Sequence, residues 1–109
     1  MADITRHSPK NETSYTSSTV LADCDPIDMR LMSSAIITFN TGTMANLQPY
    51  YSNLEDGTYR KLNSQDAESN VLSCTVGEGI DLHPSCFPVK WLKLLAGSGV
   101  GELLVDAKG

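Results

Sequence analysis

Short runs of alternating apolar and polar residues, separated by turn-forming residues, make up most of this chain. The clearest run is 34–40 (SAIITFN), in which Ala35, Ile37 and Phe39 would share one face of a strand. β-branched and aromatic residues in such alternation are typical of a half-buried strand. We therefore expect a strand here, with this face in the core.

Further short segments carry the same kind of pattern. We predict strands over 44–52, 58–62, 71–76, 80–82, 89–96 and 100–106. Segment 89–96 (VKWLKLLA) would also fit an amphipathic helical turn or two, but its bordering Pro88 and Gly97 favour a strand. Segment 27–32 is mixed and fits a strand or one helical turn. About eight short strands without a long helix predict an all-β fold: an antiparallel β-sandwich, jelly-roll-like.

Two local signals refine this prediction. Asp56-Gly57 is a favoured two-residue hairpin turn, because both central positions accept positive φ angles. It should join a strand over 50–55 to the strand over 58–62. Pro49 cannot donate a backbone hydrogen bond, so it predicts that its strand is an edge strand or carries a bulge.

The first 19 residues differ from the rest of the chain. Segment 8–19 (SPKNETSYTSST) is polar and rich in Ser and Thr, so it cannot bury enough apolar area to order itself. We predict an extended N-terminal arm over 1–19, held by Tyr15 if it is ordered, and a single β-sandwich domain over 20–109. A floppy terminus is the alternative.

Charge and composition exclude several functions. A formal net charge of −5 argues against direct binding to nucleic acid or to a membrane surface. No stretch is long and apolar enough to span a bilayer, and the N-terminus lacks the apolar region of a secretory signal. We therefore expect a protein that is used without Sec export. Three irregularly spaced cysteines favour buried, reduced thiols over a disulfide framework.

Few residues could perform chemistry. His83 and Cys86 form one weak pair, which is less than a zinc site or a nucleophile–base arrangement needs. Asp23, Asp25 and Asp28 have calcium-like spacing, but no glycine-centred loop or distal Glu follows, so a solvated turn is favoured. We expect no enzyme activity, no metal and no cofactor.

The aromatic residues allow a second interpretation. Trp91 together with Tyr50, Tyr51 and Tyr59 could form a sugar-stacking platform. Strand alternation instead favours a core position for Trp91 and for one of the adjacent Tyr50 and Tyr51, with the other tyrosine pointing outward.

Residues 33–99 resemble the small β-sandwich virion proteins of tailed bacteriophages, most closely capsid decoration (cement) proteins. The resemblance rests on the segments SSAIITFNTGT, NLQPYYSNLEDGTYRKL and GEGIDLHPSCFPVKWLKLLAGSG. It implies a jelly-roll-like module, made in the host cytoplasm, that binds the capsid exterior as a dimer or trimer. There it would bridge major capsid subunits against the pressure of packaged DNA. The alternative is a carbohydrate-binding or adhesion domain on a tail or fibre.

On this interpretation the arm is the part that reaches a neighbouring subunit, because a polar extended segment can lie across another protein or add a strand to its sheet. We expect the partner interface to include Ile4, His7, Tyr15 and Tyr51.

Deletion of residues 1–19 is expected to abolish binding to the capsid if the arm makes the contact. The measurement is co-sedimentation of the full-length and shortened proteins with capsid shells. Undiminished binding of the shortened protein would contradict a contact through the arm.

Overall fold

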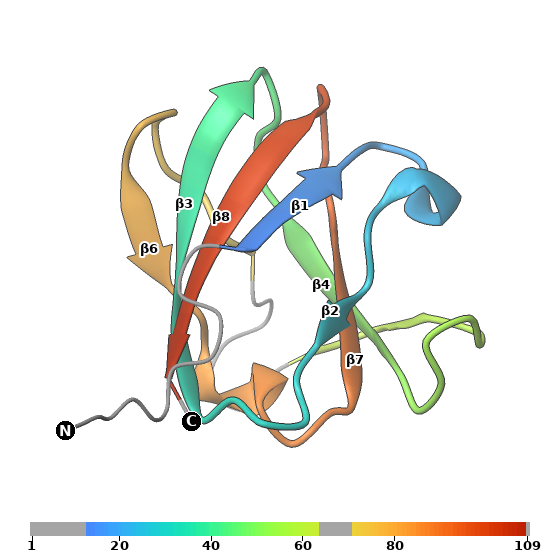
Figure 1. Ribbon diagram of the computed structural model, residues 1–109. Helices are drawn as coiled ribbons and strands as arrows, with labels where there is room; N and C mark the ends of the chain where they lie inside the picture. The colour runs from blue at the N-terminus through green and yellow to red at the C-terminus, as the bar shows by residue number, and fades with distance from the viewer. Residues whose placement is uncertain (1–12, 64–70, 109) are drawn as a thin grey trace, which may run out of the picture.

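In the part of the chain that the structure describes, eight strands form two four-stranded antiparallel sheets that pack face to face (Figure 1). This computed structural model describes residues 13–63 and 71–108. The first sheet has the order β1 (Thr13–Ser17), β8 (Gly101–Lys108), β3 (Ser34–Gly42) and β6 (Gly79–Asp81). The second sheet has the order β2 (Ile27–Asp28), β7 (Trp91–Leu95), β4 (Gln48–Ser52) and β5 (Arg60–Lys61). Two 3-10 turns, η2 (Leu21–Asp23) and η3 (Pro84–Cys86), complete the described elements.

The strand order is that of a jelly roll, in which the chain crosses repeatedly between the two sheets. The predicted all-β, jelly-roll-like sandwich is therefore confirmed. Segment 89–96 contains β7, so the choice of a strand over a helix is also confirmed. Segment 71–76 is not a strand, and only Leu72 pairs there, through a bridge to Leu47.

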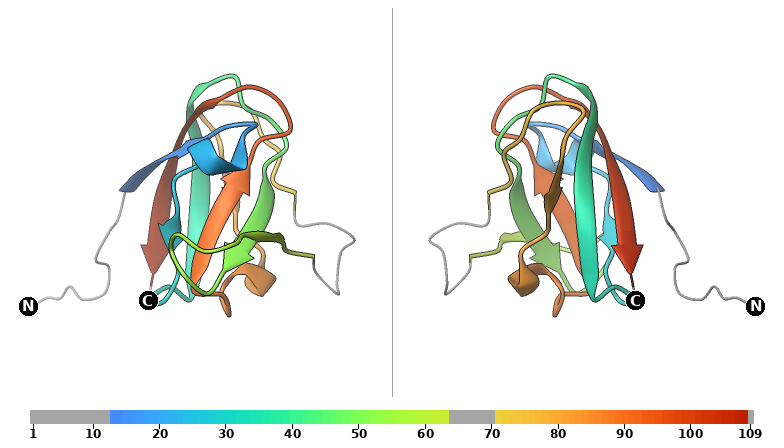
Figure 2. Two further views of the ribbon diagram at one scale, coloured as in Figure 1. Left: turned by 90° about the vertical axis from the view of Figure 1, so that its right-hand side faces the viewer. Right: turned by 90° about the vertical axis from the view of Figure 1, so that its left-hand side faces the viewer.

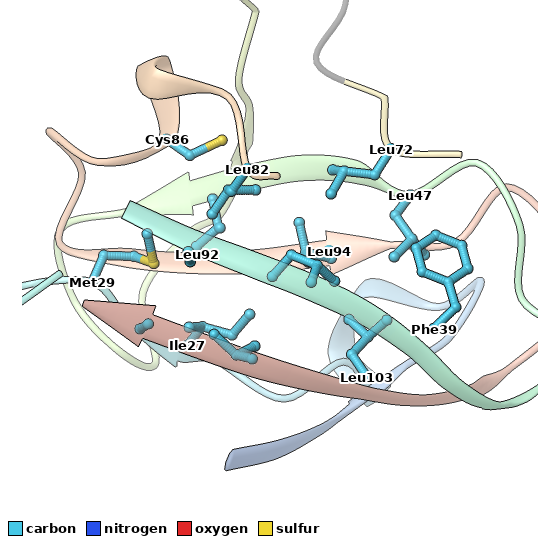
Figure 3. Close-up of a cluster of buried hydrophobic side chains, with 14 of the residues drawn as sticks. Ile27, Met29, Phe39, Leu47, Leu72, Leu82, Cys86, Leu92, Leu94 and Leu103 are labelled. Carbon is cyan, nitrogen blue, oxygen red and sulfur yellow. The ribbon is translucent and has the colours of Figure 1, made fainter. Parts of the chain in front are cut away.

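The core lies between the two sheets and is almost entirely aliphatic (Figure 3). Alternate residues of β3 point into it, and Ile37 and Phe39 are fully buried, as their spacing predicted. Leu92 and Leu94 of β7 face them from the second sheet. Burial of such side chains stabilises a fold by about 1.5–3 kcal/mol each, so these rows hold the sheets together.

Pro49 lies in a central strand, which corrects the prediction that it marks an edge or a bulge. β4 is bordered by β7 on one side and by β5 on the other. Leu62 donates its N–H to the Pro49 carbonyl at 3.0 Å, but Pro49 has no N–H to return. The Gln48 side-chain amide donates to the Leu62 carbonyl instead, at 3.1 Å. The neighbouring side chain thus replaces the missing backbone donor.

The hairpin predicted from Asp56-Gly57 is present, but its turn is longer than two residues. β4 and β5 pair through Tyr50 with Lys61, and a loop over 53–59 joins them. The Gly57 N–H donates to the Leu54 carbonyl at 3.1 Å, which closes a turn over 54–57. Neither Asp56 nor Gly57 has the positive φ angle that the predicted two-residue turn needs. The position favours glycine for another reason, because a Cβ atom would lie 2.8 Å from the Ser52 hydroxyl.

The first sheet begins within the segment 1–19 that was predicted to be an extended N-terminal arm. Thr13–Ser17 forms β1 and pairs antiparallel with β8, from Thr13 opposite Val105 to Ser17 opposite Gly101. A test of the arm should therefore delete residues 1–12 only, because a deletion to residue 19 would also remove a strand. Residues 1–12 lie outside the described part of the chain.

Two glycines with the same backbone conformation offer a matched test of the fold. Gly42 and Gly77 both have φ near 96°. A Cβ atom at Gly42 would lie 2.2 Å from the Val100 carbonyl oxygen, whereas at Gly77 nothing lies within 4 Å. We expect Gly77→Ala to cost about 1–2 kcal/mol of unfolding free energy from the φ angle alone. Gly42→Ala should cost roughly 2 kcal/mol more, because the backbone must also move.

Urea unfolding of the two variants and of the native protein measures this difference. Equal losses of unfolding free energy in the two variants would show that the close approach of Gly42 to Val100 does not constrain the loops at this end of the sandwich.

Candidate functional site

The outer face of the second sheet gathers aromatic and cationic side chains. Leu92 and Leu94 of β7 point into the core, so Trp91 and Lys93 point outward. Lys93 pairs across the sheet with Tyr50, and Trp91 lies between Asp28 of β2 and Ser52 of β4. The prediction of a core position for Trp91 is therefore wrong. Burial of Trp91 would also have buried the Lys93 ammonium group, which is far more costly.

Arg30 is fixed against Trp91 by an ion pair. Its Nη2 and Nε atoms donate to the two carboxylate oxygens of Asp28 at 2.7 Å and 2.8 Å. The guanidinium carbon lies 5.0 Å from the centre of a Trp91 ring, within the range of a cation–π contact. The hydrogen bonds that Arg30 donates to Asp28 raise the pKa of Arg30, and an arginine side chain is charged at any physiological pH. This arrangement presents a stacked, preoriented arginine.

Lys93 and Tyr59 form a second contact of the same kind. The Lys93 Nζ atom lies 4.7 Å from the Tyr59 ring centre and donates to the Leu21 carbonyl at 3.2 Å. The Tyr59 hydroxyl donates to the Glu55 carbonyl at 2.6 Å. Burial raises the pKa of Tyr59, and Glu55 and Asp56 raise it further. These contacts hold the 53–59 loop over the second sheet, as the left view of Figure 2 shows.

Two exposed leucines lie near residues of these pairs in the sequence. Leu31 directly follows Arg30 and is 77% exposed, and Leu54 directly precedes Glu55 and is 64% exposed. Glu55 adds the smallest contribution to the raised pKa of Arg30, after Asp28. We call this surface the aromatic–cation face; it consists of Arg30, Leu31, Leu54, Tyr59, Trp91 and Lys93.

The residue types of the aromatic–cation face include those that are common at protein interfaces. Trp, Tyr and Arg are the residue types most enriched at the energetic centres of protein interfaces. A sugar-stacking platform needs a bare ring face, whereas Arg30 and Lys93 each cover a ring of this surface. Sequence reasoning missed Arg30, because its contact with Trp91 depends on the pairing of Asp28 with Trp91 in the sheet. It also missed the exposed Leu31 and Leu54, which carry no pattern of their own.

Of the four interface residues predicted from sequence, the structure describes Tyr15 and Tyr51, which lie in different sheets. Ile4 and His7 lie outside the described residues. Tyr15 is half-buried and packs against the core. Burial raises the pKa of Tyr15, and the negative charge of Asp28 raises it further. Tyr51 is half-buried and pairs with Arg60 and Leu92 in the second sheet. Tyr50 points outward, so the two tyrosines do occupy opposite faces of β4.

The His83 and Cys86 side chains serve the local structure of η3. The His83 Nδ1 atom accepts the Ser85 N–H at 3.1 Å and so caps this turn. Cys86 is fully buried, and burial raises its pKa to about 11, which keeps it a neutral thiol at physiological pH. The described residues contain no group of three or more His, Cys, Asp or Glu side chains that could hold a metal ion.

Two of the three acidic residues with calcium-like spacing, Asp25 and Asp28, have other partners. One Asp25 oxygen accepts the Thr16 N–H at 2.8 Å, and Asp28 binds Arg30. These carboxylates therefore order the backbone and the aromatic–cation face.

Comparisons with known proteins leave the chain without an assigned family. No family model, no curated protein and no solved structure matches it. In the described part of the chain, no helix is long and apolar enough to cross a membrane.

The three thiols are expected to react in two classes. Cys24 and Cys86 are buried, whereas Cys74 is partly exposed, and burial raises the pKa of each. With a colorimetric disulfide reagent at pH 8, Cys74 should react first and the other two only on unfolding. Cys74→Ser should remove the fast phase. A fast phase that persists in this variant would contradict the buried positions of Cys24 and Cys86.

Proposed function

We propose that this chain is a non-enzymatic structural protein of a tailed-phage virion, which binds the assembled capsid shell and stabilises it. The observation that carries the proposal is the aromatic–cation face, which presents residue types common at protein interfaces on the outside of a jelly roll. The sequence resemblance over residues 33–99 supplies the identity of the partner, the major capsid protein. The fold expected from that resemblance is the fold observed.

Linkage explains how such a protein would stabilise a shell. A protein that binds the assembled lattice but not the free subunits lowers the free energy of the assembled state. One copy contributes modestly, whereas copies repeated over the lattice contribute in proportion to their number. Catalysis is not needed for this role.

A carbohydrate-binding domain of a tail or fibre is the second candidate. It is favoured by the placement of Trp91, Tyr50 and Tyr59 on the outer side of the second sheet. It is disfavoured by the cations that cover Trp91 and Tyr59. A glycan-array signal that Trp91→Ala abolishes in a folded protein would support this candidate over the first.

Quantitative mass spectrometry of density-banded phage particles tests the proposal directly. The copy number of the chain is measured relative to the major capsid protein. Hundreds of copies per particle would support a position on the capsid lattice, whereas a few copies would favour the tail. Absence from the particles would refute a virion role.

The aromatic–cation face should be sensitive to a charge in its apolar part. Leu31→Asp is expected to weaken binding to capsid shells by at least about tenfold, because an exposed apolar anchor is lost. Val100→Asp is the matched control, because Val100 is also exposed. It lies beside the C-terminal end of β3, whereas Leu31 lies shortly before the N-terminal end of that strand. Co-sedimentation with shells measures both variants. Equal binding of the two would exclude this face from the contact.

A further inference from the structure

The edge strands of the sandwich differ in whether their outward N–H and C=O groups form hydrogen bonds. At the β1 edge, Asp25 binds Thr16 twice: the Asp25 N–H donates to the Thr16 carbonyl at 3.0 Å, and its carboxylate accepts the Thr16 N–H at 2.8 Å. This contact blocks a further strand at β1. At the edges of the second sheet, β2 and β5 are two residues long, which limits pairing. The β6 edge of the first sheet remains.

β6 pairs regularly with β3 and turns alternate backbone groups outward. Leu82 donates to the Ala35 carbonyl at 2.9 Å, and Phe39 donates to the Glu78 carbonyl at 3.1 Å. Alternation in an antiparallel ladder then directs the N–H and C=O groups of Gly79 and Asp81 away from β3. Both residues are exposed, and no described residue forms a hydrogen bond with these outward groups. Figure 2 (right) shows β6 without another ribbon over it.

A hollow adjoins this edge at the end of the first sheet. Its volume is about 560 Å³. Ile36, Leu82 and Phe87 provide apolar lining, and Asp81, Asp106 and Lys108 are charged residues along it. Ile36 is 44% exposed and lies between Asp81 and Asp106 in the sheet register. An open strand edge beside an apolar hollow is the combination that binds extended peptides, because the edge pairs with the backbone and the hollow accepts a side chain.

We propose that β6 accepts an extended segment of a neighbouring capsid subunit as an additional strand of the first sheet. The outward groups of Gly79 and Asp81 have the spacing that an extended backbone can pair with. An apolar side chain of the segment fills the hollow at Ile36, and a Lys or Arg side chain is favoured opposite Asp81. The inference rests on the proposed function for the source of the segment.

This site and the aromatic–cation face belong to different sheets of the sandwich. One copy can therefore hold two neighbouring subunits at once, one through β6 and the other through the outer face of the second sheet. Such an arrangement gives the bridging role a geometric basis.

Hydrogen exchange read at single residues tests the inference. The protein is exchanged free and bound to purified capsid shells, then released under quench conditions. In the free protein, the amides of Ile80 and Leu82 should be protected and those of Gly79 and Asp81 should exchange fast. On the shells, exchange at Gly79 and Asp81 should slow at least about tenfold, because these amides gain hydrogen bonds.

A pair of substitutions at one position provides a second measurement. Asp81→Pro removes the outward N–H but no hydrogen bond to β3, and proline is tolerated at such edge positions. Asp81→Ala removes the same charge and keeps the N–H. We expect Asp81→Pro to bind shells at least about tenfold more weakly than Asp81→Ala, because a backbone pair is lost and the ring obstructs the incoming strand.

The outcomes separate the two proposals. Shell binding with protection at the aromatic–cation face but none at Gly79 and Asp81 would overturn the β6 site and leave the capsid function intact. Absence of shell binding by the native protein would refute the capsid function and, with it, the capsid strand at β6. Should Asp81→Pro fail to fold, the exchange measurement on the native protein decides alone.

Discussion

Burial of Leu92 and Leu94 is the constraint on which the surface chemistry of this protein depends. β7 lies at the centre of the second sheet, and its two faces differ sharply in polarity. One face can be buried without cost, whereas the other carries the Lys93 ammonium group. Because strand side chains alternate, the aliphatic face enters the core and Trp91 is carried outward with Lys93. The single tryptophan thus becomes a surface residue next to Arg30.

The sequence predicted the elements whose signals are local and periodic. The alternation of Ile37 and Phe39 identified β3 and its buried face, and turn residues separated enough short strands to indicate a jelly roll. Features that depend on pairing were harder to predict. Pro49 fits a central strand only because Gln48 lies beside the Leu62 carbonyl. Asp25 could not be assigned to the β1 edge before the position of Thr16 was known.

The candidate site shows the same division. The sequence indicated Trp91 and Tyr59 as possible members of a sugar-stacking platform. The structure instead places Arg30 against Trp91 and Lys93 against Tyr59. The ion pair of Arg30 with Asp28 is local and could have been suspected from a separation of two residues. The position of the 53–59 loop over the sheet could not have been predicted from the sequence, because it depends on the contact of Tyr59 with Lys93. The packing of the segments that carry Arg30 and Tyr59 against β7, as well as residue type, therefore determines which rings are covered by cations.

Protection of sheet edges links the fold to the proposed bridging role. An unpaired edge invites association with other chains, so soluble β proteins usually shorten, cover or charge such edges. Here Asp25 closes one edge of the first sheet, whereas β6 combines an outward-facing backbone with the adjacent hollow. Its shortness and the Asp81 charge limit indiscriminate pairing. When two weak contacts lie on different sheets, formation of the first raises the effective concentration for the second. A small domain can then hold neighbouring subunits firmly through surfaces that are each too weak to bind them alone.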